Sequence, residues 1–153
     1  KEIIDSVLDL ELKRYEDFLR DVNKEINSYK HETGIIQLPY FDLPVSAGSG
    51  VFLDSDTYEI LDVPDTAASR QATYAVRVSG DSMEPDFQNG DKILVRQQLT
   101  LEIGDLGIFI LNGEGYFKEY GGDCLISLNK AYEPVKILAD DSIYIKGKVI
   151  GKL

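Results

Sequence analysis

Hydrophobic positions at the start of the chain recur with the spacing of a helix. Apolar side chains return every three or four residues from Glu2 to about Lys30, and neither glycine nor proline interrupts them. This is the period of an amphipathic or coiled-coil-like helix. The apolar stripe consists of Ile4, Leu8, Leu12, Tyr15, Leu19, Val22 and Ile26. Such a stripe needs a partner, so the helix either packs on its own domain or pairs with a second copy of the chain.

Beyond residue 30 the pattern changes from helical to extended. Residues 31–56 contain three glycines and two prolines and are interpreted as a linker or an extended arm. Short runs of β-branched and aromatic residues follow, separated by turn residues. They lie at 58–63, 72–79, 91–97, 105–111, 115–120, 124–128 and 142–151. The sequence therefore predicts a mostly β fold: a compact antiparallel domain preceded by one long amphipathic helix.

One strand of a predicted hairpin carries a lysine between two tyrosines. Asn112-Gly113 is a strong turn signal, because both central residues of the favoured turn need positive φ. On the following strand, alternation puts Lys118 on one face with Tyr116 and Tyr120. If that face is buried, loss of water lowers the pKa of Lys118, and the lysine can serve as a base. A surface lysine lying over the two tyrosines is the alternative.

A serine lies on a tight turn between two other predicted strands. In RVSGDSMEPDFQNGDKILV, Gly80 ends one strand and Pro85 prevents a regular helix. The backbone N–H groups of Asp81 and Ser82 could point at one oxygen, as an oxyanion hole requires. An ordinary capped turn with a hydrogen-bonded serine explains the same residues.

Composition limits the chemistry available to the chain. Its single cysteine, Cys124, and single histidine, His31, cannot build an internal disulfide or a zinc site of the usual ligand count, so we expect no metal or cofactor. The net charge of −11 opposes binding to nucleic-acid phosphates. No apolar run is long enough to span a bilayer, and the acidic opening is unlike a secretory signal. We therefore expect a cytoplasmic protein without membrane contact.

The serine segment resembles that of the LexA-like and phage-repressor-type self-cleaving serine peptidases. Gly80, Ser82, Met83, Pro85, Gly90 and Asp91 match its pattern in order. The resemblance continues through GDLGIFIL, GYFKEY, LISLNKAYEP and IYIKGKVIGKL, and covers roughly residues 36–153. Glu119 is a departure, because the family often has a basic residue after its lysine.

The resemblance implies a Ser-Lys dyad whose substrate is its own chain. Ser82 would be the nucleophile, Lys118 the base, and Asp81 and Ser82 the backbone oxyanion hole. The scissile bond would be Ala47-Gly48, a small residue followed by glycine upstream of the serine. The resemblance thus divides the chain into a linker or dimerisation helix at 1–34, a linker with the cleavage site at 35–54, and a peptidase and dimerisation domain at 55–153.

The same resemblance implies a role in transcription. The chain would be the linker and C-terminal domain of a dimeric repressor, inactivated by self-cleavage in an SOS response triggered by a RecA filament on single-stranded DNA. Operator DNA would be bound only through a preceding helix-turn-helix domain. Two alternatives stay open: a signal-peptidase-like Ser-Lys protease that acts on other proteins, and a dimerisation module that has lost cleavage.

Overall fold

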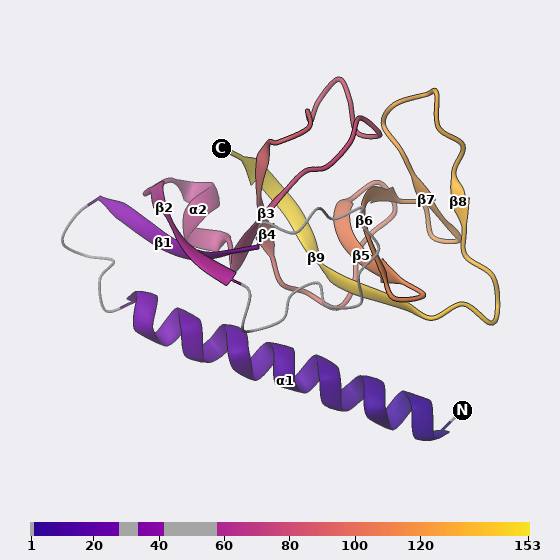
Figure 1. Ribbon diagram of the computed structural model, residues 1–153, viewed down its shortest axis with the longest axis horizontal. Coiled ribbons are helices and arrows are strands. Elements are labelled where there is room, and N and C mark those ends of the chain that lie inside the picture. The colour runs from indigo at the N-terminus through magenta and orange to yellow at the C-terminus, as the bar shows by residue number, and fades with distance from the viewer. Residues whose placement is uncertain (1, 28–33, 42–57) are drawn as a thin grey trace.

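The chain folds as one helix followed by a β-rich unit (Figure 1). The computed structural model describes residues 2–27, 34–41 and 58–153, with side chains from residue 11 to 24 in the first range. The elements are α1 (Glu2–Asn27), β1 (Ile35–Phe41), β2 (Tyr58–Pro64), α2 (Ala67–Gln71), β3 (Tyr74–Arg77), β4 (Lys92–Arg96), β5 (Leu106–Leu111), β6 (Glu114–Tyr120), β7 (Cys124–Ile126), β8 (Val135–Lys136) and β9 (Ile143–Lys152). The predicted mostly β fold with a long N-terminal helix is confirmed.

All nine described strands form one sheet, in the order β2-β1-β3-β4-β9-β5-β6-β7-β8. Every described pair is antiparallel except β1 and β3, which run parallel with Phe41 beside Val76. β9 is the long central strand that joins the two halves of the sheet (Figure 1). The hydrophobic runs therefore form strands that pair with partners distant in the chain as well as with the next strand across a turn.

β1 lies in the segment that the sequence analysis interpreted as a linker. It pairs with β2 over seven positions, from Ile35 opposite Pro64 to Phe41 opposite Tyr58, and with β3 at its end. Pro39, which lacks a backbone donor, weakened the strand signal, and Gly34 at its start resembles a loop residue. Burial compensates for this, because Ile36, Leu38 and Phe41 are at most 2% exposed.

Both faces of the sheet around β3 and β4 are buried. Alternate residues enter two different clusters, as the period of two requires. One cluster contains Phe41, Tyr74, Val76, Ile93 and Val95. The other contains Tyr40, Ala75 and Leu94 and is covered by Ala68 of α2 and the neighbouring Ala72. This double burial explains why these strands read as continuous apolar runs rather than as alternating ones.

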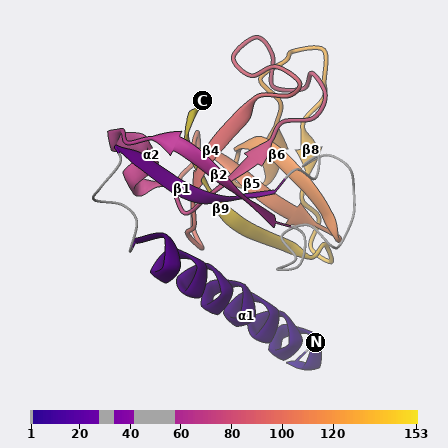
Figure 2. The ribbon, with the colours of Figure 1, turned by 60° about the vertical axis from the view of Figure 1, so that its left-hand side comes forward.

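α1 contributes to the first of these clusters. Tyr15 and Leu19 are buried in it, and Phe18 packs edge-on against Phe41 and Tyr58, with ring centroids 6.5 and 5.1 Å apart. The helix runs along one side of the sheet, below β1 and β2 in Figure 2. The side chains of Tyr15, Phe18 and Leu19 therefore pack on their own domain. Pairing with a second copy stays a prediction.

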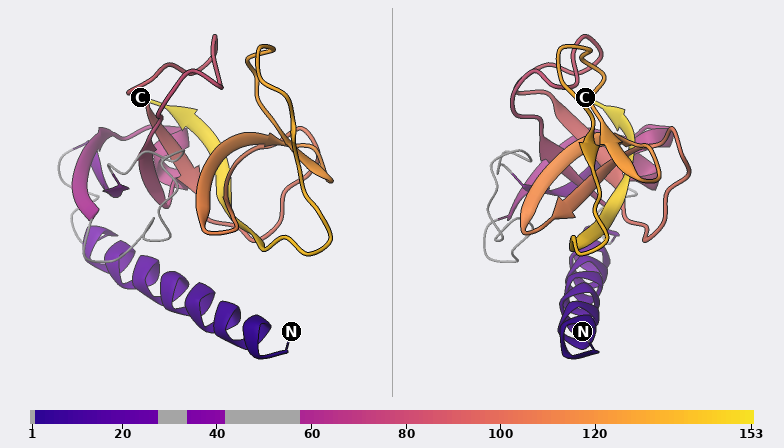
Figure 3. Two further views of the ribbon diagram at one scale, coloured as in Figure 1. Left: turned by 45° about the vertical axis from the view of Figure 1, so that its right-hand side comes forward. Right: turned by 90° about the vertical axis from the view of Figure 1, so that its right-hand side faces the viewer.

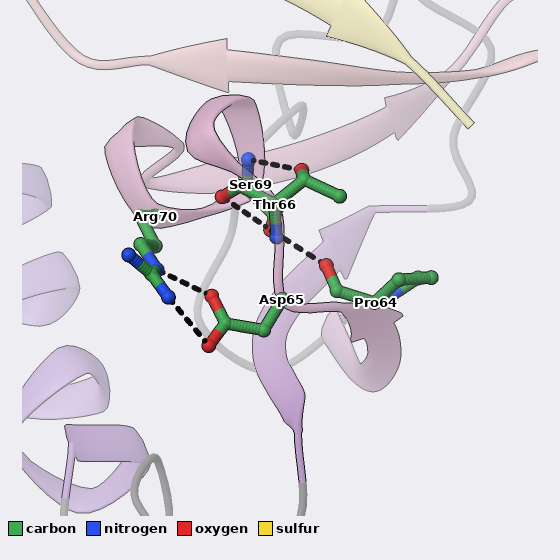
Figure 4. Close-up of polar contacts among 5 residues, drawn as sticks. All are labelled: Pro64, Asp65, Thr66, Ser69 and Arg70. Atoms are coloured by element: carbon green, nitrogen blue, oxygen red, sulfur yellow. Dashed lines mark hydrogen bonds and ion pairs between the residues drawn. The ribbon is translucent and has the colours of Figure 1, made fainter.

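The short helix α2 was not foreseen from the hydrophobic pattern. It begins with a capping box in which Ser69 N donates to Thr66 Oγ1 at 3.1 Å and Thr66 N donates to Ser69 Oγ at 2.8 Å (Figure 4). The Ser69 hydroxyl also donates to the Pro64 carbonyl at 2.7 Å, and Arg70 pairs with Asp65. Local polar contacts thus define a helix too short for periodicity to reveal.

β9 contains two irregularities, and a close approach of backbones lies near one of them. Its pairing shifts by one residue against β4 and again against β5, which marks β-bulges. Near the second shift, a Cβ on Gly147 would lie 2.7 Å from the Arg96 carbonyl oxygen and 2.5 Å from a Val95 methyl. A Cβ on Gly151, by contrast, would meet Ala68 at an ordinary 3.5 Å.

We expect Gly147→Ala to destabilise the protein by about 1–3 kcal/mol, because the carbonyl oxygen it meets belongs to a paired strand and cannot turn away. Gly151→Ala, on the same strand, is the matched control and should change stability by less than about 1 kcal/mol. Urea unfolding of both variants measures the difference. Equal stabilities for the two would contradict the close approach at Gly147.

Candidate active site

Ser82 lies on a loop between β3 and β4 whose base is closed by backbone hydrogen bonds. Val78 N donates to Asp91 O and Gly90 N donates to Val78 O, both at 2.8 Å. Gly80 reverses the chain with φ of 82°, a conformation that favours glycine. The next residue after the serine, Met83, is 1% exposed and enters the cluster that α1 also joins. The turn is therefore anchored in the core on one side of Ser82.

Lys118 lies on the hairpin that the sequence predicted. Asn112 and Gly113 have φ of 51° and 83°, and Leu111 pairs with Glu114 across the turn. Tyr116 and Tyr120 pack on the cluster of Phe109, Leu111 and Leu125, whereas Phe117 enters the other cluster. The predicted separation of Tyr116 and Tyr120 from Phe117 along β6 is thus confirmed.

The structure brings the predicted serine and lysine together. Lys118 Nζ donates a hydrogen bond to Ser82 Oγ at 2.8 Å, although the two residues are 36 positions apart. The Lys118 side chain is buried, with its residue 8% exposed. Burial lowers the pKa of Lys118 below its ordinary value of 10.5. Within the described ranges, no carboxylate forms an ion pair with this ammonium to oppose that effect.

A small pocket opens beside the serine and the lysine. It is lined by Val78, Ser79, Ser82, Met83, Tyr116, Phe117 and Lys118. The ring of Phe87 packs edge-on against Phe117 of this lining, with centroids 4.8 Å apart. A larger cavity, between α1 and residues 97–99, contains neither Ser82 nor Lys118. Only the smaller pocket brings a nucleophile and a base into contact, as covalent catalysis requires.

The backbone N–H groups predicted as an oxyanion hole are available at the turn. Neither Asp81 N nor Ser82 N donates a hydrogen bond to any residue in the part of the chain that the structure describes. Asp81 is exposed and Ser82 is half-buried. An incoming oxygen could therefore accept from either donor without displacing a protein partner.

Two residues that the sequence analysis did not single out hold the serine turn in place. Asn129 N donates to Ser82 O and Asn129 Nδ2 donates to Asp81 O, each at 3.0 Å, and the Tyr132 hydroxyl donates to the Asp81 carboxylate. Both residues come from the loop between β7 and β8, which lies beside the serine loop at the end of the molecule away from α1 (Figure 3). Their sequence signal is the run LISLNKAYEP, which contains both residues and matches the family resemblance.

The predicted scissile bond, Ala47-Gly48, lies outside the described residues. The strands on either side of it are described, and β1 and β2 pair with each other along their whole length.

Among the described helices, none is both long and apolar enough to cross a membrane.

Comparison with known proteins places this geometry in a family. A LexA repressor of Carboxydothermus hydrogenoformans is 34% identical over 116 residues, which cover 71% of this chain and 56% of that protein. A LexA repressor of Acetivibrio thermocellus is 31% identical over 136 residues, covering 86% of this chain and 61% of that protein. The chain thus spans little more than half the length of these relatives. A model of the Peptidase S24-like family matches residues 39–150, which include Ser82, Lys118 and Asn129, and the chain therefore belongs to that LexA-like peptidase family.

Proposed function

We propose that this chain is the self-cleaving region of a LexA-like transcriptional repressor, which cuts its own Ala47-Gly48 bond with Ser82 as nucleophile and Lys118 as base. The observation that carries the proposal is the 2.8 Å contact between Lys118 Nζ and Ser82 Oγ. A serine hydroxyl is a weak nucleophile unless a base takes its proton. A lysine that burial drives toward its neutral form supplies such a base without any histidine.

The parallel pairing of β1 and β3 supports the choice of scissile bond. Phe41, at the end of β1, lies beside Val76 of β3, and both strands run in the same direction. Ala47 follows Phe41 by six residues, and Ser82 follows Val76 by six. Two chain segments of equal length thus start side by side toward the same end of the sheet, so the substrate segment has the reach to meet the nucleophile.

The proposed reaction begins when neutral Lys118 accepts the Ser82 hydroxyl proton and Ser82 Oγ attacks the Ala47 carbonyl carbon. The backbone N–H groups of Asp81 and Ser82 stabilise the oxyanion of the tetrahedral intermediate. Lys118 then gives the proton to the departing Gly48 nitrogen, which leaves residues 1–47 as an ester on Ser82. Water hydrolyses this ester with Lys118 again as base. Because enzyme and substrate are one chain, proximity supplies much of the acceleration, and each molecule reacts once.

The proposed role is the inactivation of a repressor. The similar proteins named above are LexA repressors, and this chain matches just over half of their length. Its net charge of −11 opposes DNA binding by this region, so operator contacts fall to a helix-turn-helix domain in a longer protein. The region then supplies dimerisation and cleavage, with residues 1–34 as the connecting helix and a RecA filament on single-stranded DNA as the trigger of an SOS response.

We expect the purified chain to cut itself at alkaline pH into fragments of 47 and 106 residues, the two parts of 153. The rate should rise as pH increases, because a larger fraction of Lys118 is neutral, and its midpoint should lie below 10.5. Mass spectrometry of timed samples between pH 7 and 11 measures both. Ser82→Ala and Lys118→Ala should lower the rate by about 10³-fold or more.

Three outcomes of that experiment separate the alternatives. Cleavage after another residue would overturn the choice of Ala47-Gly48. Products that form only from added peptides would favour a signal-peptidase-like enzyme that acts on other proteins. A wild-type chain that stays intact at every pH would favour a dimerisation module without cleavage.

We expect Lys118→Met to abolish cleavage and to stabilise the fold at pH 7 by about 1 kcal/mol, because function often retains a destabilising group. The pKa of Lys118 is lower in the folded protein than in the unfolded chain. Below the folded-state pKa the charged lysine destabilises the fold by its full amount, and this cost disappears as pH rises to the unfolded-state pKa. The gain should therefore shrink as pH rises toward 10.5. Thermal unfolding of both proteins at several pH values tests this, with Lys148→Met, at a half-exposed position on β9, as control. A gain independent of pH would contradict the burial of an unpaired ammonium.

A further inference from the structure

Asn129 contacts the peptide groups on both sides of the serine. Its backbone N–H donates to the Ser82 carbonyl, and its side-chain amide Nδ2 donates to the Asp81 carbonyl, each at 3.0 Å. The Asp81 carbonyl accepts a second hydrogen bond from Glu84 N at 3.2 Å. Asn129 therefore fixes the orientation of the peptide planes before and after the Ser82 Cα.

Because the peptide bond is planar, the hydrogen bond from Asn129 to the Asp81 carbonyl also sets the direction of the Ser82 N–H. The Asp81 carbonyl and the Ser82 N–H belong to one trans peptide unit, in which the C=O and N–H bonds point in opposite directions. Holding the carbonyl toward Asn129 therefore directs the Ser82 N–H away from Asn129. That N–H has no partner in the described ranges. It is one of the two donors assigned to the oxyanion in the proposed function.

The Asn129 side chain is itself held in a fixed turn. Its Oδ1 accepts from Ala131 N at 3.0 Å, and its backbone carbonyl accepts from Tyr132 N at 3.2 Å. The turn brings the Tyr132 hydroxyl to the Asp81 carboxylate. The hydrogen bond to Asp81 raises the pKa of Tyr132 above its ordinary 10.0, so this donor keeps its proton during an assay at mildly alkaline pH.

From these contacts we infer that Asn129 is a positioning residue for self-cleavage, which acts by aligning the Ser82 N–H of the oxyanion hole, and that Tyr132 supports it through Asp81. The inference rests on the proposed function and assigns the loop between β7 and β8 a part in it. Asn129 touches neither Lys118 nor the Ser82 hydroxyl among its described hydrogen bonds. Loss of the Asn129 amide should therefore leave the pKa of Lys118 unchanged but weaken the stabilisation of the transition state.

Asn129→Asp is the sharpest variant, because it keeps the backbone donor to Ser82 and an oxygen for Ala131 N but removes the amide donor to Asp81. We expect the plateau rate of self-cleavage to fall roughly 10- to 100-fold, since complete loss of an oxyanion donor costs about 10²–10³. Asn129→Ala should lose a similar factor, and because it adds no carboxylate near Lys118, its pH at half-maximal rate should not move. Tyr132→Phe should lose less, about three- to tenfold. Tyr144→Phe, on β9, whose hydroxyl contacts only Ser142 among the described hydrogen bonds, should react like wild type.

A small fluorophosphonate separates alignment of the turn from docking of the substrate segment. Ser82 Oγ forms a bond to phosphorus, the P–F bond breaks, fluoride leaves, and Lys118 receives the hydroxyl proton. This reaction needs the oxyanion donors but not the segment around Ala47. We expect the rate constant for Ser82 modification, followed by intact mass, to fall in Asn129→Asp by a factor similar to that for cleavage.

The outcomes are distinguishable from failure of the proposed function. Wild type that neither cuts itself nor reacts with the fluorophosphonate overturns the proposed function. An active wild type with Asn129→Asp equally active, or with slower cleavage but unchanged phosphonylation, overturns the role of Asn129. A shifted pH midpoint in Asn129→Ala, which adds no charge, does so as well. If the Asn129 variants melt far below wild type, Tyr132→Phe decides, because it removes one exposed hydroxyl contact and keeps the ring.

Discussion

The burial of one lysine without a counter-charge governs the organisation of this molecule. Lys118 donates to Ser82 and, in the described residues, forms no ion pair with a carboxylate. A carboxylate there would stabilise the ammonium and raise its pKa, which is the opposite of what a base requires. Met83 and Phe117, which line the same pocket as Lys118, belong to the hydrophobic core. The fold must supply enough packing elsewhere to tolerate a group that opposes folding.

That packing comes from a sheet with both faces covered around β3 and β4. The residues that face α1 and those that face α2 alternate along the same strands. Met83, next to the nucleophile, shares its cluster with Tyr15 and Leu19 of the N-terminal helix. Displacement of α1 would therefore remove contacts from the same core that anchors the serine turn, although the helix lies at the other end of the molecule (Figure 3).

The sequence was informative where local chemistry determines structure. The Asn112-Gly113 turn, the faces of β6 and the long helix follow from φ preferences and periodicity, and Ser82 with Lys118 came from the resemblance of ordered motifs. It was uninformative where long-range contacts decide. β1 contains a proline and is a strand only because β2 and β3 flank it. In the sequence Asn129 is an ordinary loop residue. Its contact is visible only in the fold, where its amide reaches the carbonyl of Asp81, 48 positions earlier.

The interior position of β1 in the sheet determines how the two fragments of a cleaved chain would stay together. β1 is an interior strand, paired with β2 over seven positions and with β3 at its end, and α1 packs beside it. A cut between β1 and β2 would leave the first on one fragment and the second on the other. Hydrogen bonds and side-chain packing would still join the fragments as a nicked complex. Dissociation of the amino-terminal piece is then a separate event from hydrolysis, with a lifetime set by the extraction of a strand from the middle of a sheet.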